Sequence, residues 1–245
     1  MKIVAIIQAR MTSTRLPGKV LKKVLDKPLL EYQIERIQRS KHLHEIVIAT
    51  TTNETDNPIV ELANKLGINV YRGSEEDVLS RYHEAAIQYG ADIIVRLTSD
   101  CPVIDPKVVD NVIQYYLENQ SRYDYVSNTL TRSYPRGMDT EVFTFQALKE
   151  SYNEAEEKHE REHVTPFIYL RPNRYSLGSV QYITDKSTYR WTVDTPEDFE
   201  LIRRIIENLY PSNPHFTLED TITLLETNPD WLEINRMIEQ KELGE

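Results

Sequence analysis

The sequence predicts an α/β fold with a mostly parallel central sheet flanked by helices, followed by a mixed α+β second half. Two observations lead to this prediction. Short apolar segments rich in β-branched residues alternate with amphipathic helical segments over residues 1–122. From Tyr123 onward this alternation becomes irregular. Because 245 residues fit one large α/β domain, we expect a single domain with halves 1–122 and 123–245.

The first half begins directly with a strand, because residues 3–7 are apolar at every position, as in strands buried on both faces. Gly67 and Gly90 each follow a helical pattern at the usual post-helix position. The other strands expected here span 45–51, 68–71 and 92–97, and the helices span 29–39, 58–66, 78–89 and 106–118.

The second half is expected to mix strands and helices. Thr195 provides a capping hydroxyl and Pro196 a first-turn proline for a helix that reaches about residue 209. The remaining strands are expected at 123–128, 139–145, 175–183 and 190–193, and the remaining helices at 146–156, 163–170, 217–227 and 230–242.

Composition narrows the classes of function. The formal net charge of −10 disfavours general binding to nucleic acid, which requires clustered Lys and Arg. Cys101 is the single cysteine, so neither an intrachain disulfide nor a Cys-rich zinc site can form. No signal-peptide pattern or membrane-spanning apolar run occurs, and we expect a soluble cytoplasmic protein without membrane insertion. The sequence leaves a homodimer open.

A basic loop follows the first strand and carries Arg10, Arg15 and Lys19. In open α/β sheets ligands bind beyond the carboxyl ends of the strands, and guanidinium and ammonium groups suit phosphate oxygens. The loop is not a P-loop, because Ser13 stands at the first glycine position and Val20 at the hydroxyl position. It also lacks the dinucleotide fingerprint. A solvated basic loop is the alternative interpretation.

This segment, QARMTSTRLPGKVL, resembles the signature of the cytidylyltransferases that make CMP-activated acidic sugars, and most closely the spore-coat polysaccharide biosynthesis F-type (SpsF-like) branch. The resemblance implies a GT-A-like nucleotidyltransferase in which the loop wraps the nucleoside triphosphate and its three cations contact the phosphates. The residues that carry it are Gln8, Ala9, Arg10, Ser13, Arg15, Leu16, Pro17, Gly18 and Lys19.

Asp100 and Asp194 each follow an apolar strand pattern, so parallel strands could bring both to one edge of the sheet. Carboxylates beside a triphosphate are suited to Mg²⁺, which prefers hard oxygen ligands. The alternative is that Asp100 stabilises a turn and Asp194 helps to start a helix. DCPVID and RWTVDTPEDF resemble the two metal-aspartate segments of the family, which implies Mg²⁺ binding by both residues.

Three further residues are candidates for nucleotide binding. The segment 72–82 resembles the one that closes over the nucleotide and contains Ser74 and Arg81, although Ser74 could instead cap the next helix. Arg96 lies within the strand leading to Asp100 and either faces the nucleotide or pairs with an interior acid. The full predicted nucleotide site is Gln8, Ala9, Arg10, Ser13, Arg15, Lys19, Ser74, Arg81 and Arg96.

The acceptor site is predicted in the irregular half, where YPRGMDTEVF and EREHVTP also resemble SpsF-like segments. Arg136 could hold a carboxylate or phosphate, and Asp139 and Glu141 could accept hydrogen bonds from sugar hydroxyls. His163 could bind substrate or carry a proton, or it could be a structural histidine within a helix surface.

The sequence therefore favours an enzyme that transfers CMP from CTP to an acidic sugar or related polysaccharide precursor and releases pyrophosphate. Residues 1–122 would bind the nucleotide, and residues 123–245 the acceptor. The catalytic residues would be Arg10, Lys19, Asp100 and Asp194. One alternative is a nucleotide-sugar glycosyltransferase, although the chain lacks a second acid next to Asp100 at Asp-x-Asp spacing. Another is a non-catalytic nucleotide-binding partner.

Overall fold

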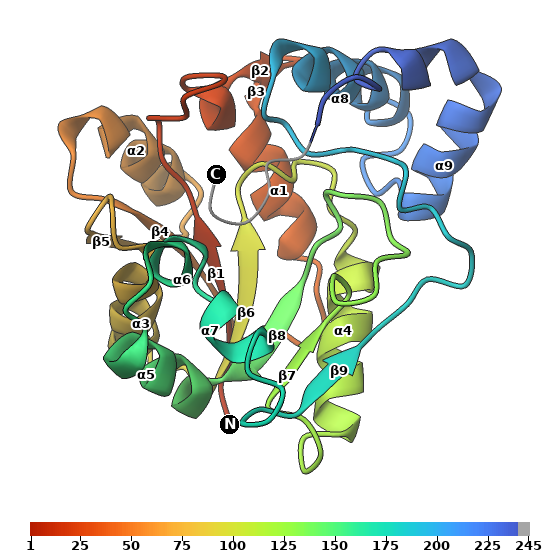
Figure 1. Ribbon diagram of the computed structural model, residues 1–245. Helices are drawn as coiled ribbons and strands as arrows, with labels where there is room; N and C mark the ends of the chain where they lie inside the picture. The colour runs from red at the N-terminus through yellow and green to blue at the C-terminus, as the bar shows by residue number, and fades with distance from the viewer. Residues whose placement is uncertain (240–245) are drawn as a thin grey trace.

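A seven-stranded sheet forms the centre of the protein in the computed structural model, which describes residues 1–239 (Figure 1). The strand order is β5-β4-β1-β6-β8-β7-β9, and β2 pairs with β3 in a separate small hairpin. The strands are β1 (Ile3–Gln8), β2 (Lys23–Val24), β3 (Lys27–Pro28), β4 (Glu45–Thr51), β5 (Asn69–Gly73), β6 (Ile93–Thr98), β7 (Tyr125–Ser127), β8 (Glu141–Thr144) and β9 (Leu177–Ser179).

The directions of the strands determine which strand ends, and therefore which loops, meet at one edge of the sheet. β1 runs parallel to β4 and β6, and Gln8 at its end pairs with Thr98 at the end of β6. β8 runs antiparallel to β6, so that Glu141 at its start lies beside Arg96 near the end of β6. The loops that follow β1 and β6 and the segment that precedes β8 therefore reach the same edge.

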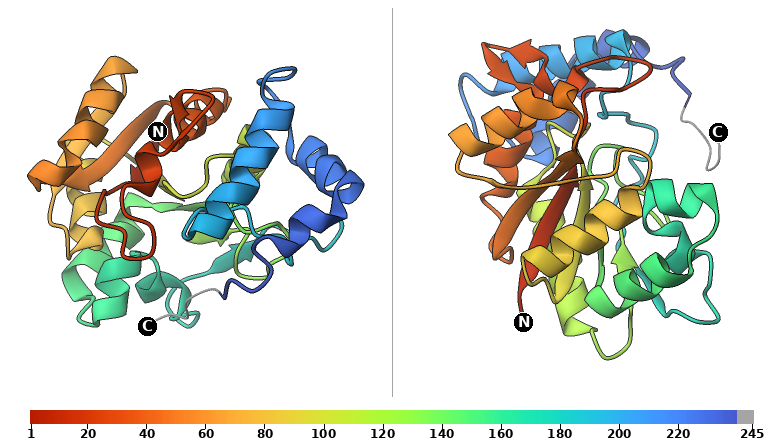
Figure 2. Two further views of the ribbon diagram at one scale, coloured as in Figure 1. Left: turned by 90° about the horizontal axis from the view of Figure 1, so that it is seen from above. Right: turned by 90° about the vertical axis from the view of Figure 1, so that its left-hand side faces the viewer.

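Helices cover both faces of this sheet (Figure 2). The α-helices are α1 (Leu29–Ile37), α2 (Asn57–Lys65), α3 (Val78–Gln88), α4 (Pro106–Glu118), α5 (Phe145–Glu154), α6 (Lys158–His163), α7 (Pro166–Tyr169), α8 (Pro196–Leu209) and α9 (Leu218–Thr227). Short 3₁₀ turns are η1 (Lys19–Leu21), η2 (Glu54–Asp56) and η3 (Pro229–Glu233). None of the helices within residues 1–239 is long and apolar enough to cross a membrane.

The two faces of β1 enter different cores, because successive side chains of a strand point to opposite faces. Ile3, Ala5 and Ile7 pack with residues of α1, α2, α4 and α8. Val4 and Ile6 pack with residues of α3 and α5 on the other face. Burying each Ile or Val side chain contributes about 1.5–3 kcal/mol, so this double burial fixes β1 firmly at the centre of the sheet.

The predicted α/β class, the mostly parallel sheet and the mixed second half are confirmed, but the predictions for three elements were wrong. Residues 190–193 form an extended segment with only one β-bridge, from Arg190 to Arg136. Of the helix expected at 163–170, only His163 belongs to α6 and only Pro166–Tyr169 form the short helix α7, and between them Val164 has a φ of 73°. Pro166 explains the break, because proline lacks an N–H and its ring would clash with a preceding helical turn.

The helix expected at 230–242 was the third error. Its described part contains only the 3₁₀ turn η3 and then irregular chain, and residues 240–242 lie outside the described residues. Asn235 in this segment is buried against Arg190 instead of continuing a helix. This contact becomes important in the site.

Candidate functional site

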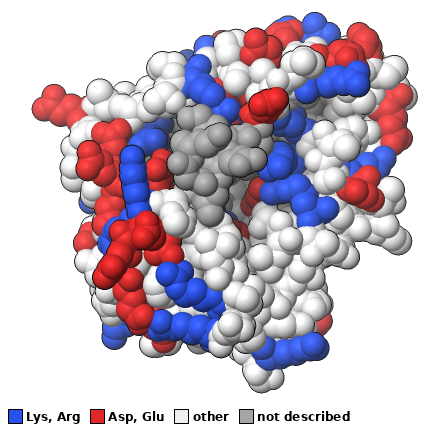
Figure 3. All heavy atoms as spheres, in the orientation of Figure 1, with Lys and Arg blue, Asp and Glu red and all other residues white. Residues whose placement is uncertain are grey.

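A cavity of about 820 Å³ lies at the carboxyl edge of β1 and β6. Its walls come from the loop after β1, the end of β6, residues 129–139, α6 with α7, and residues 192–194. On the face shown in Figure 3, Asp and Glu lie mostly around the margins, whereas one group of Lys and Arg lies near the middle, next to the grey atoms, and others lie along the lower edge. The molecule is thus acidic overall, but its cavity is rich in cations.

The structure brings nearly all of the predicted site residues into this one cavity. Its lining includes Gln8, Ala9, Arg10, Ser13, Arg15, Lys19, Arg81, Arg96, Asp100, Arg136, Asp139, Glu141, His163 and Asp194. Ser74 is outside the lining, and its hydroxyl accepts a hydrogen bond from the backbone N–H of Asp77 at 3.1 Å. The N-cap of α3 is Asp77, whose side chain accepts the N–H of Ser80, so Ser74 supports the cap residue rather than capping the helix itself.

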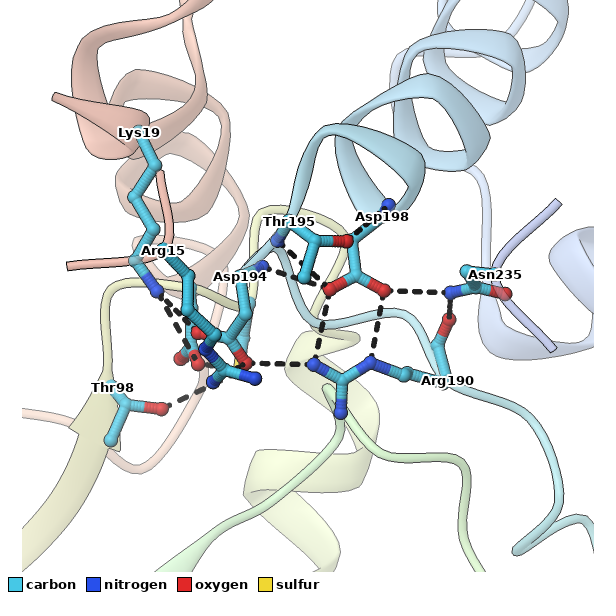
Figure 4. Close-up of polar contacts among 10 residues, drawn as sticks. Arg15, Lys19, Thr98, Arg190, Asp194, Thr195, Asp198 and Asn235 are labelled. Atoms are coloured by element: carbon cyan, nitrogen blue, oxygen red, sulfur yellow. Dashed lines mark hydrogen bonds and ion pairs between the residues drawn. The ribbon is translucent and has the colours of Figure 1, made fainter. Parts of the chain in front are cut away.

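Two cations of the basic loop lie against the predicted metal aspartates (Figure 4). The ammonium of Lys19 lies 2.8 Å from Oδ1 of Asp194 and 3.9 Å from Oδ2 of Asp100. Arg15 reaches Oδ2 of Asp194 at 3.0 Å. A positive charge thus lies between two carboxylates that are 94 positions apart in the sequence.

Backbone contacts hold the basic loop over the edge of the sheet. Gly18 has a φ of 68° and donates its N–H to the carbonyl of Met11 at 2.9 Å, which closes the loop. Met11 in turn donates its N–H to the buried carboxylate of Asp56 at 2.8 Å. Arg10 lies 3.8 Å from Glu75, a longer contact than those that Arg15 and Lys19 make with Asp194. The loop is anchored at its base, and its cationic side chains face the cavity.

Asp194 is held from its other side by a buried guanidinium that sequence reasoning missed. Arg190 donates to Oδ2 of Asp194 at 2.8 Å and to both oxygens of Asp198 at 2.9 and 3.0 Å (Figure 4). Burial would raise the pKa of the Asp194 carboxyl, but the nearby charges of Lys19, Arg15 and Arg190 outweigh burial and lower it. Asp194 is therefore ionised at neutral pH.

At the opposite wall, Glu141 is already engaged by donors of the protein itself. Its Oε1 accepts hydrogen bonds from Tyr125 at 2.6 Å and Thr165 at 2.7 Å, and its Oε2 accepts from Arg96. Arg96 also donates to the side-chain oxygen of Gln8 at 3.1 Å. Glu141 thus fixes Arg96 in the cavity wall. Of the two interpretations of Arg96 from the sequence, the one in which it pairs with an interior acid agrees with the structure.

His163 lines the same wall. Burial lowers its pKa below the ordinary value of 6.5, and the charge of Arg96 lowers it further. The imidazole is therefore neutral at pH 7, in which form it can both donate and accept a hydrogen bond.

Two arginines of the cavity have no acidic partner at ion-pair distance among the described residues. Arg81 is 2% exposed, and its Nε and Nη1 lack hydrogen-bond partners. Burial lowers the pKa of Arg81, and nearby Arg10 adds to the effect. Arg136 lies at another part of the wall, where burial and the neighbouring Arg132 lower its pKa. By contrast, Arg132 makes a two-pronged contact with Asp139 at 2.6 and 2.8 Å.

The unpaired buried guanidinium of Arg81 is costly unless an anion neutralises it, and the half-buried guanidinium of Arg136 also lacks an acidic partner among the described residues. Arg81 and Arg136 come from different segments of the cavity wall, so the cavity offers two separate positions for anionic groups. Nε of Arg96 and Oγ1 of Thr192, which also belong to lining residues, are buried without partners as well. This lining suits a polar, multiply charged ligand.

The two aspartates are the residues that could hold a divalent cation. Within residues 1–239 no cluster of three or more His, Cys, Asp or Glu side chains is placed to bind a metal on its own. Asp100 and Asp194 already face one cationic group, the ammonium of Lys19, from two sides. In proteins Mg²⁺ is usually bound by one or two carboxylates together with phosphate oxygens and water, so the pair Asp100 and Asp194 fits a Mg²⁺ site.

A parallel-sheet fold with paired carboxylates and clustered cations at its carboxyl edge is that of a nucleotidyltransferase. A family model described as cytidylyltransferase matches residues 4–226, and the chain belongs to the cytidylyltransferase family.

Individual relatives agree with this assignment. The chain is 37% identical over 238 residues to the spore coat polysaccharide biosynthesis protein SpsF of Bacillus subtilis, covering 93% of this chain and 95% of SpsF. A solved cytidylyltransferase from Leptospira borgpetersenii superposes with a TM-score of 0.92 at 37% identity, over 98% of this chain and all of that one. CMP:2-keto-3-deoxy-manno-octonic acid synthetase, solved with CTP, shares the fold with a TM-score of 0.64 at 19% identity, over 84% and 99% of the two chains.

Proposed function

We propose that this protein transfers CMP from CTP to an acidic sugar or a related polysaccharide precursor in the cytoplasm and releases pyrophosphate. The observation that carries the proposal is the meeting of Arg15 and Lys19 with Asp100 and Asp194 at one edge of the sheet. The names of SpsF and of the CTP-bound synthetase support the choice of CTP and of a sugar acceptor.

The residues divide into groups with distinct tasks. Arg10, Arg15 and Lys19 hold the triphosphate through charge-assisted hydrogen bonds, and Arg81 adds a buried positive charge beside Arg10. The backbone of Gln8 and Ala9 lies where the loop begins and faces the base and ribose. The role of residues 1–122 is thus nucleotide binding, although Asp194 joins them from the second half.

Asp100 and Asp194 would hold Mg²⁺, which neutralises phosphate charge as it develops during phosphoryl transfer. Before the nucleotide binds, Lys19 and Arg15 neutralise these carboxylates. When the triphosphate enters, the same cations exchange their carboxylate partners for phosphate oxygens. This exchange would leave the carboxylates of Asp100 and Asp194 free to hold Mg²⁺.

The acceptor binds against the segment before β8 and the wall formed by α6 and α7. Arg136 pairs with the acidic group of the acceptor, because it is the cation of this wall without an acid partner among the described residues. Asp139 and neutral His163 contact its hydroxyls, while Glu141 keeps Arg96 in place. The acceptor oxygen attacks the α-phosphorus in line with the departing pyrophosphate, and catalysis comes from positioning and charge stabilisation.

The test is pyrophosphate release measured with CTP, UTP, ATP and GTP, each across a panel of acidic sugars and their neutral analogues. We expect turnover with CTP and at least one acidic sugar, and loss of turnover in Asp100→Asn and Asp194→Asn at limiting Mg²⁺. Arg122→Ala, a change of an exposed arginine outside the cavity lining, is the matched control. Turnover that prefers another nucleotide, or that survives both aspartate changes, would refute the proposal.

A further inference from the structure

We infer that Arg190, Asp198 and Asn235 form a positioning cluster that orients the Asp194 carboxylate for divalent-cation binding. This inference rests on the proposed function, in which Asp194 holds the metal. It assigns a role in the reaction to the segment after α9, because Asn235 lies in that segment. We call these three residues the Arg190 cluster.

The cluster begins at Asn235, which is 6% exposed. Its side-chain amide donates to the backbone carbonyl of Arg190 at 3.0 Å and to Oδ1 of Asp198 at 2.8 Å. One amide group therefore fixes the main chain of Arg190 and the carboxylate with which that arginine pairs. Figure 4 shows Asn235 reaching this pair from the side opposite the basic loop.

Arg190 transmits this constraint to Asp194. Its Nε and Nη2 bind both oxygens of Asp198, so the planar guanidinium has a fixed orientation. The same Nη2 then donates to Oδ2 of Asp194 at 2.8 Å. Moving the guanidinium would break all three of these contacts, so the cluster restrains Oδ2 from the buried side, while Arg15 contacts the same oxygen from the basic loop.

Asp198 also fixes the main chain of Asp194. Its Oδ2 accepts the backbone N–H groups of Asp194 at 3.0 Å and of Thr195 at 3.2 Å. Asp194 is thus held at its backbone by Asp198 and at one side-chain oxygen by Arg190. The other oxygen, Oδ1, faces Lys19, which also lies beside Asp100.

The different surroundings of the two Asp194 oxygens indicate that the cluster orients this carboxylate and does not only stabilise the fold. A buried ion pair contributes little net stability after the cost of removing both charges from water, and well-packed apolar residues could replace it. Here the ionic cluster holds one oxygen of Asp194 and leaves the second toward the cavity. Groups that orient metal ligands in this way commonly change metal affinity by about 10- to 100-fold when they are removed.

The experiment measures Mn²⁺ binding to the full-length protein with CTP and no acceptor, by the relaxation enhancement of water protons, with Mn²⁺ and CTP alone as the blank. Arg190→Lys keeps the charge but loses the planar fork, and we expect about 10- to 100-fold weaker Mn²⁺ binding. Asn235 contacts Arg190 and Asp198 but not Asp194 itself, so for Asn235→Ala we expect a smaller effect, with about three- to tenfold weaker Mn²⁺ binding. CTP binding in EDTA, measured by calorimetry, should stay within about twofold of wild type, since the cluster contacts none of the proposed phosphate ligands other than through Asp194.

Asn228→Ala is the matched control. Asn228 lies at the start of the same segment, and its amide donates to Leu224 at 2.9 Å and Thr227 at 3.2 Å, away from the cluster. It should lower the melting temperature as Asn235→Ala does, but leave Mn²⁺ binding unchanged. If Arg190→Lys does not fold, Asn235→Ala alone decides the question.

The outcomes separate the two hypotheses. Wild-type Mn²⁺ affinity in folded Asn235→Ala and Arg190→Lys would overturn the positioning role and leave the proposed function standing. A wild-type protein that binds CTP but no Mn²⁺ would refute the metal site itself, and the cluster's role with it. Weakened Mn²⁺ binding in the two cluster variants, with Asn228→Ala unaffected, would establish the inference.

Discussion

In the proposed function, Lys19 is the residue at which nucleotide binding and metal binding would meet. Its ammonium contacts Asp194 at 2.8 Å and lies 3.9 Å from Asp100, and the same group is proposed to bind phosphate. Each ligand would therefore change the charge surroundings of the other. Because the two carboxylates are already neutralised by side chains, free Mg²⁺ should bind weakly unless a triphosphate draws those cations away.

Lys19→Ala should weaken CTP binding more than CMP binding, because the lost contact is to the outer phosphates. A charge-assisted hydrogen bond is worth about 1.5–3 kcal/mol, which corresponds to about 10- to 100-fold in affinity. Titration calorimetry with the two nucleotides measures the difference. Lys23→Ala, which changes an exposed lysine of β2, is the control. Equal losses for CTP and CMP would show that Lys19 does not reach the β- and γ-phosphates.

His163 should make stability depend on pH below neutrality. Since burial and Arg96 lower its pKa below 6.5 in the folded protein, the unfolded chain takes up a proton first as the pH falls. Stability is then lost below about pH 6.5 until the folded state is protonated too.

His163→Gln should remove this component. Urea unfolding at about pH 7.5 and about pH 5.5 tests it, because wild type should lose more stability between these values than the variant does. Exposed His215, changed to glutamine, is the control. An identical pH dependence in wild type and His163→Gln would contradict the expectation.

Sequence reasoning found the residues whose position follows from a strand end. Asp100 lies just beyond the end of β6 and Lys19 lies in the loop that follows β1, and parallel strands bring such ends together. Asp198 was detectable as the third residue of a capping box begun by Thr195. No periodicity or motif could place Asn235, because its partners are 37 and 45 positions away.

At the scale of elements, the start of α8 links helix stability to the site. The side-chain hydroxyl of Thr195 accepts a hydrogen bond from the N–H of Asp198 at 3.2 Å, and the carboxylate of Asp198 in turn accepts one from the N–H of Thr195. Helix α9 begins with the same reciprocal arrangement between Thr217 and Asp220, with the same 3.2 Å cap distance. The two caps are chemically alike, but Asp198 also accepts the backbone N–H of Asp194, a residue that lines the cavity.

Thr195→Ala and Thr217→Ala should therefore cost similar stability, about 1 kcal/mol each. Only Thr195→Ala should raise the Mg²⁺ concentration needed for half-maximal turnover, since it loosens Asp198 and through it Asp194. Thermal unfolding and a magnesium titration of the rate provide the two measurements. Equal magnesium dependence in both variants would show that the start of α8 does not orient Asp194.

The predictability of the elements differs for a physical reason. β4 and α4 were predicted with the observed bounds, because an apolar run and an amphipathic pattern reflect burial directly. Residues 190–193 also show burial, but their N–H groups bond to single carbonyls such as that of Asp100 rather than to a ladder. An apolar sequence pattern therefore cannot distinguish a strand from an extended segment that crosses the core without a ladder of hydrogen bonds.

At the scale of the whole molecule, the antiparallel entry of β8 brings residues 129–139 to the cavity beside the loop after β1 and the end of β6, which belong to the parallel half. Gly137 shows how tightly this segment is packed, because it has a φ of 103° and a Cβ there would lie 2.8 Å from the backbone of Trp191. The proposed division of labour between a nucleotide half and an acceptor half depends on this crossing.

Arg136→Ala should raise the acceptor KM or lower kcat while leaving CTP affinity nearly unchanged. Loss of its charge-assisted contact predicts a fall of about 10- to 100-fold in kcat/KM for the acceptor. Steady-state kinetics with varied acceptor, together with CTP calorimetry, separate the two effects, and Arg122→Ala is again the control. Impaired CTP binding with normal acceptor kinetics would reverse the assignment of the two halves.

Cys101, next to Asp100, gives the protein a natural labelling site that reports on opening. It is the single thiol of the chain, it is 1% exposed, and burial together with Asp100 raises its pKa. A thiol-specific reagent can therefore modify the folded protein only during moments when the end of β6 becomes accessible. The labelling rate of the unmodified sequence would measure how often that happens, and its slowing by CTP would measure how firmly the bound nucleotide closes the site.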